Sequence, residues 1–228
     1  MSGGDGGAAP LRTTLARVLD ARGALPPDLA LELIDRLAAR LAAGSFDVGR
    51  LVRLSPAAVE VALDGDGGGP TAGGVRSVRI LPGPEPAGDP PEPYMAWPEL
   101  GQALSGSSGL GQADAGGEAA GVYCLGVLLY HMLQGRAPFA ARDIDVLATM
   151  HLRAEPPRPS GAVAATAEDV LWRALARRRE DRYPSVAAFR SAVAATAPDG
   201  RGGSARRCIV ARTSMSRAAN GARPWSMW

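Results

Sequence analysis

Apolar residues in the first part of the chain recur at helical spacing. A short helix is predicted from Leu11 to Ala21, ending at Gly23. A second helix is predicted over 28–43, because Asp28 is a good helix cap and an apolar stripe follows it, made by Leu29, Leu33, Ile34, Leu37 and Leu41. Gly44 is a natural stop for this helix.

The next segment alternates between strand-like runs and loops. Short strands are predicted at 51–54, 59–63 and 75–81, with Ser55 and Pro56 as a turn between the first two. Glycine-rich, proline-dense and glycine/serine-rich sequence indicates loops or extended chain at 64–74, 82–93 and 105–117.

From residue 119 onward the pattern is helical. The segment 122–134 is apolar nearly all round, which is typical of a helix buried on every side, and Gly135 should end it. Its apolar residues are Val122, Leu125, Val127, Leu128, Leu129, Met132 and Leu133. Three amphipathic helices are predicted near 142–153, 166–178 and 185–195, with a proline-rich loop at 153–160.

The two ends of the chain lack an apolar period. Residues 1–10 are rich in glycine, and residues 199–228 are rich in arginine, glycine and serine, so both segments are expected to be disordered. One folded domain is therefore predicted at 11–198, mainly α-helical with a few short strands.

Composition narrows the classes of function. The net charge of +2 gives no strong attraction to nucleic acid or to a membrane surface. The longest apolar run, 122–133, is shorter than the about 20 residues that a bilayer span requires. Cys124 in an apolar run and Cys208 in a polar tail fit a reducing compartment, and we expect a cytoplasmic protein without nucleic-acid partners.

Several motifs, in the same order along the chain, resemble the C-terminal lobe of bacterial serine/threonine protein kinases. The strongest match is Gly121 to Phe139, which resembles the buried central helix of that lobe and the loop after it. The match continues through His151 to Pro159 and Leu171 to Phe189. It is patchy upstream, where Tyr94 to Glu99 resembles a further motif of the family with Trp97 inserted. The resemblance implies a kinase-like C-lobe whose catalytic loop lies within 51–63 and whose metal-binding motif follows 75–81. It also implies that the N-terminal lobe is missing, because only about 27 residues precede the first matched helix.

The residues that perform phosphoryl transfer in that family are not found at the matching positions. A kinase uses a strand Lys, the Asp and Asn of its catalytic loop and the Asp of D-F-G. The chain has no Lys, its only Asn is Asn220, and Leu81 or Pro82 stands where the metal-binding Asp would be. No H-R-D motif occurs, and Asp47 is interpreted as a solvated loop residue because position 52 is Val. We therefore predict no catalytic, cofactor-binding or metal-binding residue.

The matched residues are those that maintain packing. Glu99 and Arg182 stand where the family has a structural ion pair, so the resemblance implies that pair here. Removing one partner of a buried pair costs about 3–5 kcal/mol.

Three functions remain open at this point. The first is an inactive, pseudokinase-like module that binds another protein, such as a kinase or a kinase substrate, in signalling. The second is a kinase fragment that needs another chain, and only this alternative requires ATP and magnesium. The third is a truncated or frame-shifted product without function.

Overall fold

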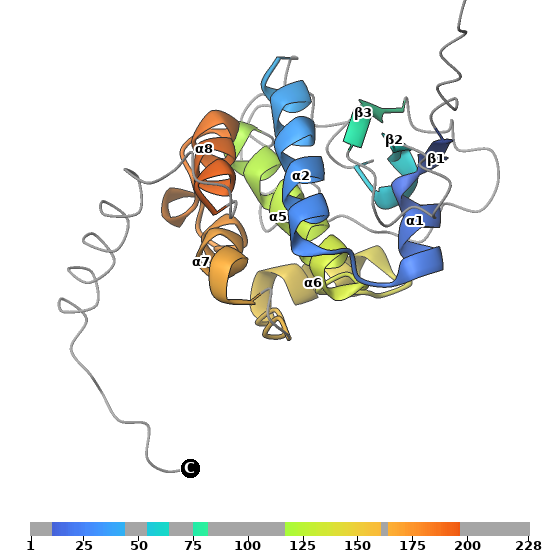
Figure 1. The fold of residues 1–228 in the computed structure, drawn as a ribbon. Coiled ribbons are helices and arrows are strands. Elements are labelled where there is room, and N and C mark those ends of the chain that lie inside the picture. Colours follow the sequence, from blue (N-terminus) through green and yellow to red (C-terminus); the bar gives the residue numbers. More distant parts are fainter. Residues whose placement is uncertain (1–10, 44–53, 64–74, 82–116, 161–163, 197–228) are drawn as a thin grey trace, which may run out of the picture.

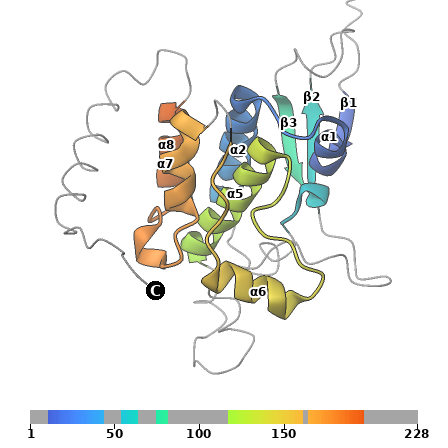
Figure 2. The same ribbon diagram turned by 90° about the horizontal axis from the view of Figure 1, so that it is seen from below.

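The computed structural model describes residues 11–43, 54–63, 75–81, 117–160 and 164–196. Their elements form three side-by-side groups (Figures 1 and 2). Helices α2 (27–42) and α5 (117–134) lie in the centre. Helices α7 (164–174) and α8 (186–196) pack on one side, and a small sheet with helix α1 (15–22) lies on the other. Helix α6 lies across one end of this arrangement. The chain is therefore mainly helical, as predicted. The proposed disordered ends, 1–10 and 199–228, lie outside the described residues and stay predictions.

The sheet contains three antiparallel strands in the order β1-β2-β3: Leu11–Thr14, Val59–Leu63 and Val75–Ile80. The predicted strands at 59–63 and 75–81 are confirmed, the second one residue shorter. The third predicted strand, 51–54, lies outside the described residues except for Leu54, which is not in a strand. A 3-10 turn, Pro56–Ala58, leads directly into β2.

The predicted helix from Leu11 is wrong in its first four residues. These residues form β1, in which Leu11 pairs with Leu63 and Thr14 pairs with Glu60 along the edge of β2. Helix α1 then covers Leu15–Arg22, and the Thr14 side chain accepts a hydrogen bond from the Arg17 backbone N–H at 3.4 Å. Long-range pairing to β2 thus overrides the local helical pattern. Gly23 ends the helix with a φ of 68°, as the sequence indicates.

Helix α2 spans Pro27–Ala42, close to the prediction. Pro26 occupies the cap position without a side-chain hydrogen bond, so the expected capping role of Asp28 is wrong. Asp28 instead lies in the first turn, where its negative charge favours the helix N-terminus. Gly44 lies outside the described residues.

Helix α5 spans Gly117–Gln134 and begins five residues before its predicted start at residue 122. Val122, Leu125, Leu128, Leu129 and Met132 are all fully buried, because other elements pack around the helix on every side. Gly135 follows with a φ of 69° and ends it. No described helix combines the length and the apolar character that a membrane crossing needs.

The three remaining predicted helices are confirmed with shifted ends. They are α6, Ile144–Arg153, α7, Ala164–Ala174, and α8, Val186–Thr196. A 3-10 turn, Arg179–Asp181, lies between α7 and α8. Helix α8 also packs on α2, where the Arg190 guanidinium donates to both carboxylate oxygens of Asp35 at 2.7 and 3.2 Å.

Gly126 sets the close approach of α5 to α7. A Cβ added at Gly126 would lie 2.9 Å from the Ala174 Cβ and 3.2 Å from the Leu175 Cδ2. Because this interior is closely packed, the two helices would have to move apart to admit even one methyl group.

We expect Gly126→Ala to lower the free energy of unfolding by about 1–3 kcal/mol, the usual cost of overpacking a core. Gly117→Ala is the matched control, since a Cβ there meets nothing within 4 Å. Chemical denaturation of both variants measures the difference. Equal stability of Gly126→Ala and the unchanged chain would contradict the tight contact.

Candidate functional site

The ends of β2 and β3 form the first candidate site. The Leu81 backbone N–H, just after β3, donates to the Ala58 carbonyl oxygen, just before β2, at 2.8 Å. The two segments that the resemblance assigns to the catalytic loop and the metal motif therefore lie side by side.

The side chains at these strand ends do not suit magnesium, which prefers carboxylate and other oxygen ligands. Residues 54–58 are Leu-Ser-Pro-Ala-Ala, and the facing residue is Leu81. Within the ranges that the structure describes, no group of three or more His, Cys, Asp or Glu could hold a metal ion. Asp47 and position 52 lie outside those ranges.

Arg182 is a buried side chain that connects the start of α5 to the segment after α7. It is 1% exposed, and its guanidinium donates to the carbonyl oxygens of Ala176 at 2.6 Å, Arg177 at 2.8 Å and Ala119 at 3.1 Å. It also lies over the Tyr123 ring, 4.8 Å from the centroid. Glu99 lies outside the described residues, so the Glu99–Arg182 ion pair stays a prediction.

A cluster of aromatic rings continues from Arg182 toward α6. The Tyr123 hydroxyl and the His151 Nδ1 are 2.7 Å apart and share a hydrogen bond. The Phe139 ring meets the His151 ring edge-on at a centroid distance of 4.8 Å. These contacts link the central helix α5 to the C-terminal turn of α6 and to the loop after α5.

His151 is held in its neutral form. It is 1% exposed, and its Nε2 atom has no hydrogen-bond partner and no contact with solvent. Burial lowers the pKa of His151 to about 4. Burial also lowers the pKa of His131, although the Asp20 carboxylate partly opposes that shift.

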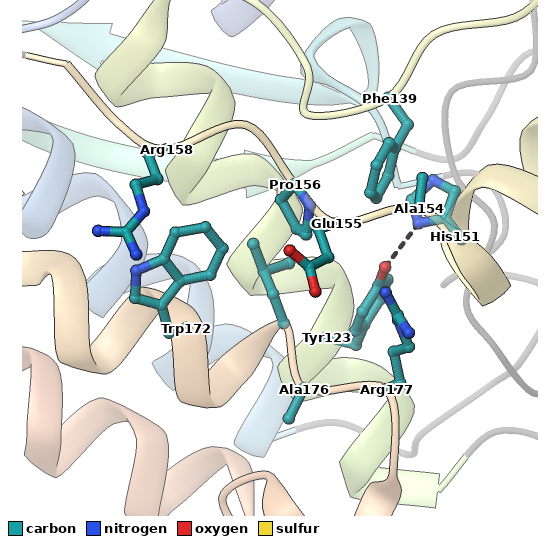
Figure 3. Close-up of a pocket in the computed structure, with 11 residues that line it drawn as sticks. Tyr123, Phe139, His151, Ala154, Glu155, Pro156, Arg158, Trp172, Ala176 and Arg177 are labelled. Atoms are coloured by element: carbon teal, nitrogen blue, oxygen red, sulfur yellow. Dashed lines mark hydrogen bonds between the residues drawn. The ribbon is translucent and has the colours of Figure 1, made fainter. Parts of the chain in front are cut away.

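The second candidate site is a cavity of about 460 Å³ beside this aromatic cluster (Figure 3). Its volume falls in the range of ligand pockets, about 300–1,000 Å³. Its walls come from α5, the end of α6, the proline-rich loop and the end of α7. The lining includes Tyr123, His151, Glu155, Arg158, Trp172 and Arg177.

Sequence reasoning missed this cavity and one cap. Trp172 is half-buried and lines the cavity, and its Nε1–H donates to Glu168 Oε1 at 3.0 Å. Glu118 on α5 accepts from the Val186 backbone N–H at 2.8 Å and so caps α8. Neither feature has a local signal, because each joins residues far apart in the chain.

We expect His151 to make the protein less stable as the pH falls. Its pKa is about 4 when folded and 6.5 ordinarily, so the unfolded state binds the proton first between these values. Stability is thus fully present above about pH 6.5 and falls toward pH 4, by about 3 kcal/mol from this residue.

His151→Gln tests this because Gln can keep a hydrogen bond to Tyr123 and does not titrate. Denaturation across this pH range should show a smaller loss of stability for the variant than for the unchanged chain. His131→Gln, as the comparison, should reduce the loss less. Parallel stability curves for His151→Gln and the unchanged chain would refute the assignment.

Comparisons with known proteins agree with the motifs. No family model matches the chain. A stretch of 77 residues, 32% of the chain, is 46% identical to the serine/threonine-protein kinase Pkn1 of Myxococcus xanthus. Over 73 residues, 31% of the chain, the sequence is 36% identical to the serine/threonine-protein kinase PknB of Mycobacterium tuberculosis. These matches span 11% and 12% of the two kinases.

The fold comparison covers more of the chain. The PknI kinase domain of Mycobacterium tuberculosis, solved as a double mutant, aligns with 83% of this chain and 64% of its own, at a TM-score of 0.52 and 21% identity. That likeness establishes a partial protein-kinase fold.

Proposed function

We propose that this relative of the bacterial serine/threonine protein kinases is a catalytically inactive, kinase-like module that binds another protein in the cytoplasm as part of signalling. The observation that carries the proposal is the backbone contact between Ala58 and Leu81. It joins the two segments from which a kinase would present its metal ligands, and both residues have hydrocarbon side chains.

The chemistry supports inactivity. Kinases stabilise the transferring phosphoryl group with metal ions, a positioned Lys and a carboxylate base, and a single arginine finger is worth about 10³–10⁵ in rate in related enzymes. This chain has no Lys, and Arg is a poor replacement because its planar, forked guanidinium presents donors differently from a compact ammonium. Several such losses at once leave the transition state without charge stabilisation.

The packing supports a folded module over a truncated product. The buried helix α5, the Arg182 anchor and the Glu118 cap each require partners from distant segments, and the described chain supplies them. A sequence free of selection would be expected to lose such contacts first, because most substitutions at buried sites destabilise.

The full chain should not transfer phosphate from ATP. With magnesium and radiolabelled ATP, we expect no label on the chain or on a general protein substrate, and no change in melting temperature on adding both ligands. The PknB kinase domain, assayed in parallel, is the positive control. Magnesium-dependent labelling by the purified chain would overturn the proposal and favour the kinase-fragment alternative.

Two exposed apolar side chains on α6 support the binding role. Val146 is 52% exposed and Leu152 is 36% exposed, and they are the exposed large hydrophobic side chains of the described residues. A shallow groove along the same helix is lined by Val146, Thr149 and Met150. Exposed apolar patches commonly mark surfaces for protein partners.

We expect Val146→Asp to weaken partner binding with little effect on stability, because Val146 is half exposed. The full chain and the variant are used as baits for extracts of the native host. Ala187→Asp, on the exposed face of α8, is the matched control.

A protein retained by the unchanged chain and the control but lost with Val146→Asp is then purified and titrated. Binding about tenfold weaker for Val146→Asp supports the α6 surface. Equal binding of all three chains would exclude that surface, and no retained protein would count against the module.

A further inference from the structure

We propose that the cavity beside α5 binds a free α-amino acid with an aromatic side chain. The proposal rests on the chemistry of the cavity wall and does not depend on the inactivity or the protein partner proposed above. Three features of the wall carry it: the Glu155 carboxylate, the Arg177 guanidinium with one hydrogen bond to the backbone, and the half-buried Trp172 indole.

Glu155 supplies a carboxylate without a partner of its own. Among the described residues it makes no ion pair and no side-chain hydrogen bond, and Figure 3 places it in the middle of the cavity between Arg158 and Arg177. Pro156 and Pro157 follow it and restrict the backbone there. The Glu155 side chain is exposed, so its carboxylate is accessible from the mouth of the cavity, where it favours a cationic group such as the ligand's ammonium.

Arg177 supplies a positioned cation on one side of Glu155. Its Nη2 donates to the Arg153 carbonyl oxygen at 3.0 Å, which leaves the other guanidinium N–H groups available. A guanidinium already held in place loses less freedom when it binds, and its fork matches a carboxylate. We assign the ligand's carboxylate to Arg177.

Trp172 supplies an aromatic wall on the other side of Glu155, and Arg158 lies next to it in Figure 3. The indole is oriented by its hydrogen bond to Glu168. An aromatic side chain of the ligand would stack against Trp172, and Arg158 would lie over that ring as a cation–π partner. Ammonium, carboxylate and ring thus match three neighbouring parts of one wall.

Ligands with a charge of one sign only fit this wall less well. A simple anion would meet the Glu155 carboxylate, and a simple organic cation would meet two arginines. With His151 neutral, the lining side chains carry two positive charges and one negative charge. A zwitterion satisfies both signs at once.

Titration calorimetry of the full chain near neutral pH tests the assignment with four probes. L-Phenylalanine carries all three groups. Phenethylamine lacks the carboxylate, 3-phenylpropanoate lacks the ammonium, and L-alanine lacks the ring. We expect phenylalanine to bind at least about tenfold more tightly than each of the other three, because each omission removes a charged or stacking contact.

Two cavity variants test which side chain contacts the ammonium and which contacts the carboxylate of the ligand. Glu155→Gln should weaken phenylalanine about tenfold and leave 3-phenylpropanoate unchanged or tighter, whereas Arg177→Gln should weaken phenylalanine and leave phenethylamine unchanged. Glu180→Gln, an exposed carboxylate outside the cavity lining, is the control and should change neither. Melting temperatures identify any variant that fails to fold.

Two results would overturn the proposal: no heat of binding for phenylalanine at millimolar concentration, or equal affinity for phenylalanine and 3-phenylpropanoate. Neither result bears on phosphate transfer or on the α6 surface, so this experiment tests ligand binding in the cavity independently of the proposed function.

Discussion

The need to cover helix α5 on every side governs the rest of this structure. From Ala120 to Leu133 the helix has almost no exposed side chain, and each buried Val or Leu contributes about 1.5–3 kcal/mol only while neighbouring elements exclude water from it. Helices α2, α7 and α8 provide much of that cover. Gly126 allows α7 to approach so closely that Ala174 lies in contact with the α5 backbone. Much of the stability of the helical lobe therefore comes from this burial.

The contact between the ends of β2 and β3 differs in kind from this apolar burial. The strand ends near Ala58 and Leu81 are joined by backbone hydrogen bonding, which does not depend on the side chains. A substitution at Gly126 or Arg182, by contrast, disturbs the core directly.

The parts that the sequence predicts well are those with a strong local period. The all-apolar run predicted that α5 is buried. Gly23 and Gly135 indicated helix ends, and each adopts a positive φ there. Parts set by distant partners were missed or misassigned. Residues Leu11–Thr14 become a strand because β2 offers them an edge, and the cavity forms where residues between 123 and 177 converge. No local pattern reports the Asp35–Arg190 or Glu118–Val186 contacts, since their partners are far apart in the chain.

The Tyr123–His151 hydrogen bond joins the buried scaffold to the cavity wall. Tyr123 belongs to α5 and lies under the Arg182 guanidinium, while His151 ends α6 and forms part of the cavity lining. The His151 imidazole is buried, and burial disfavours its charged form, so the neutral form is favoured. The same neutral ring leaves Glu155 and the two arginines as the charges of the wall. Core packing thereby sets both the protonation of His151 and the electrostatics that a ligand in the cavity would meet.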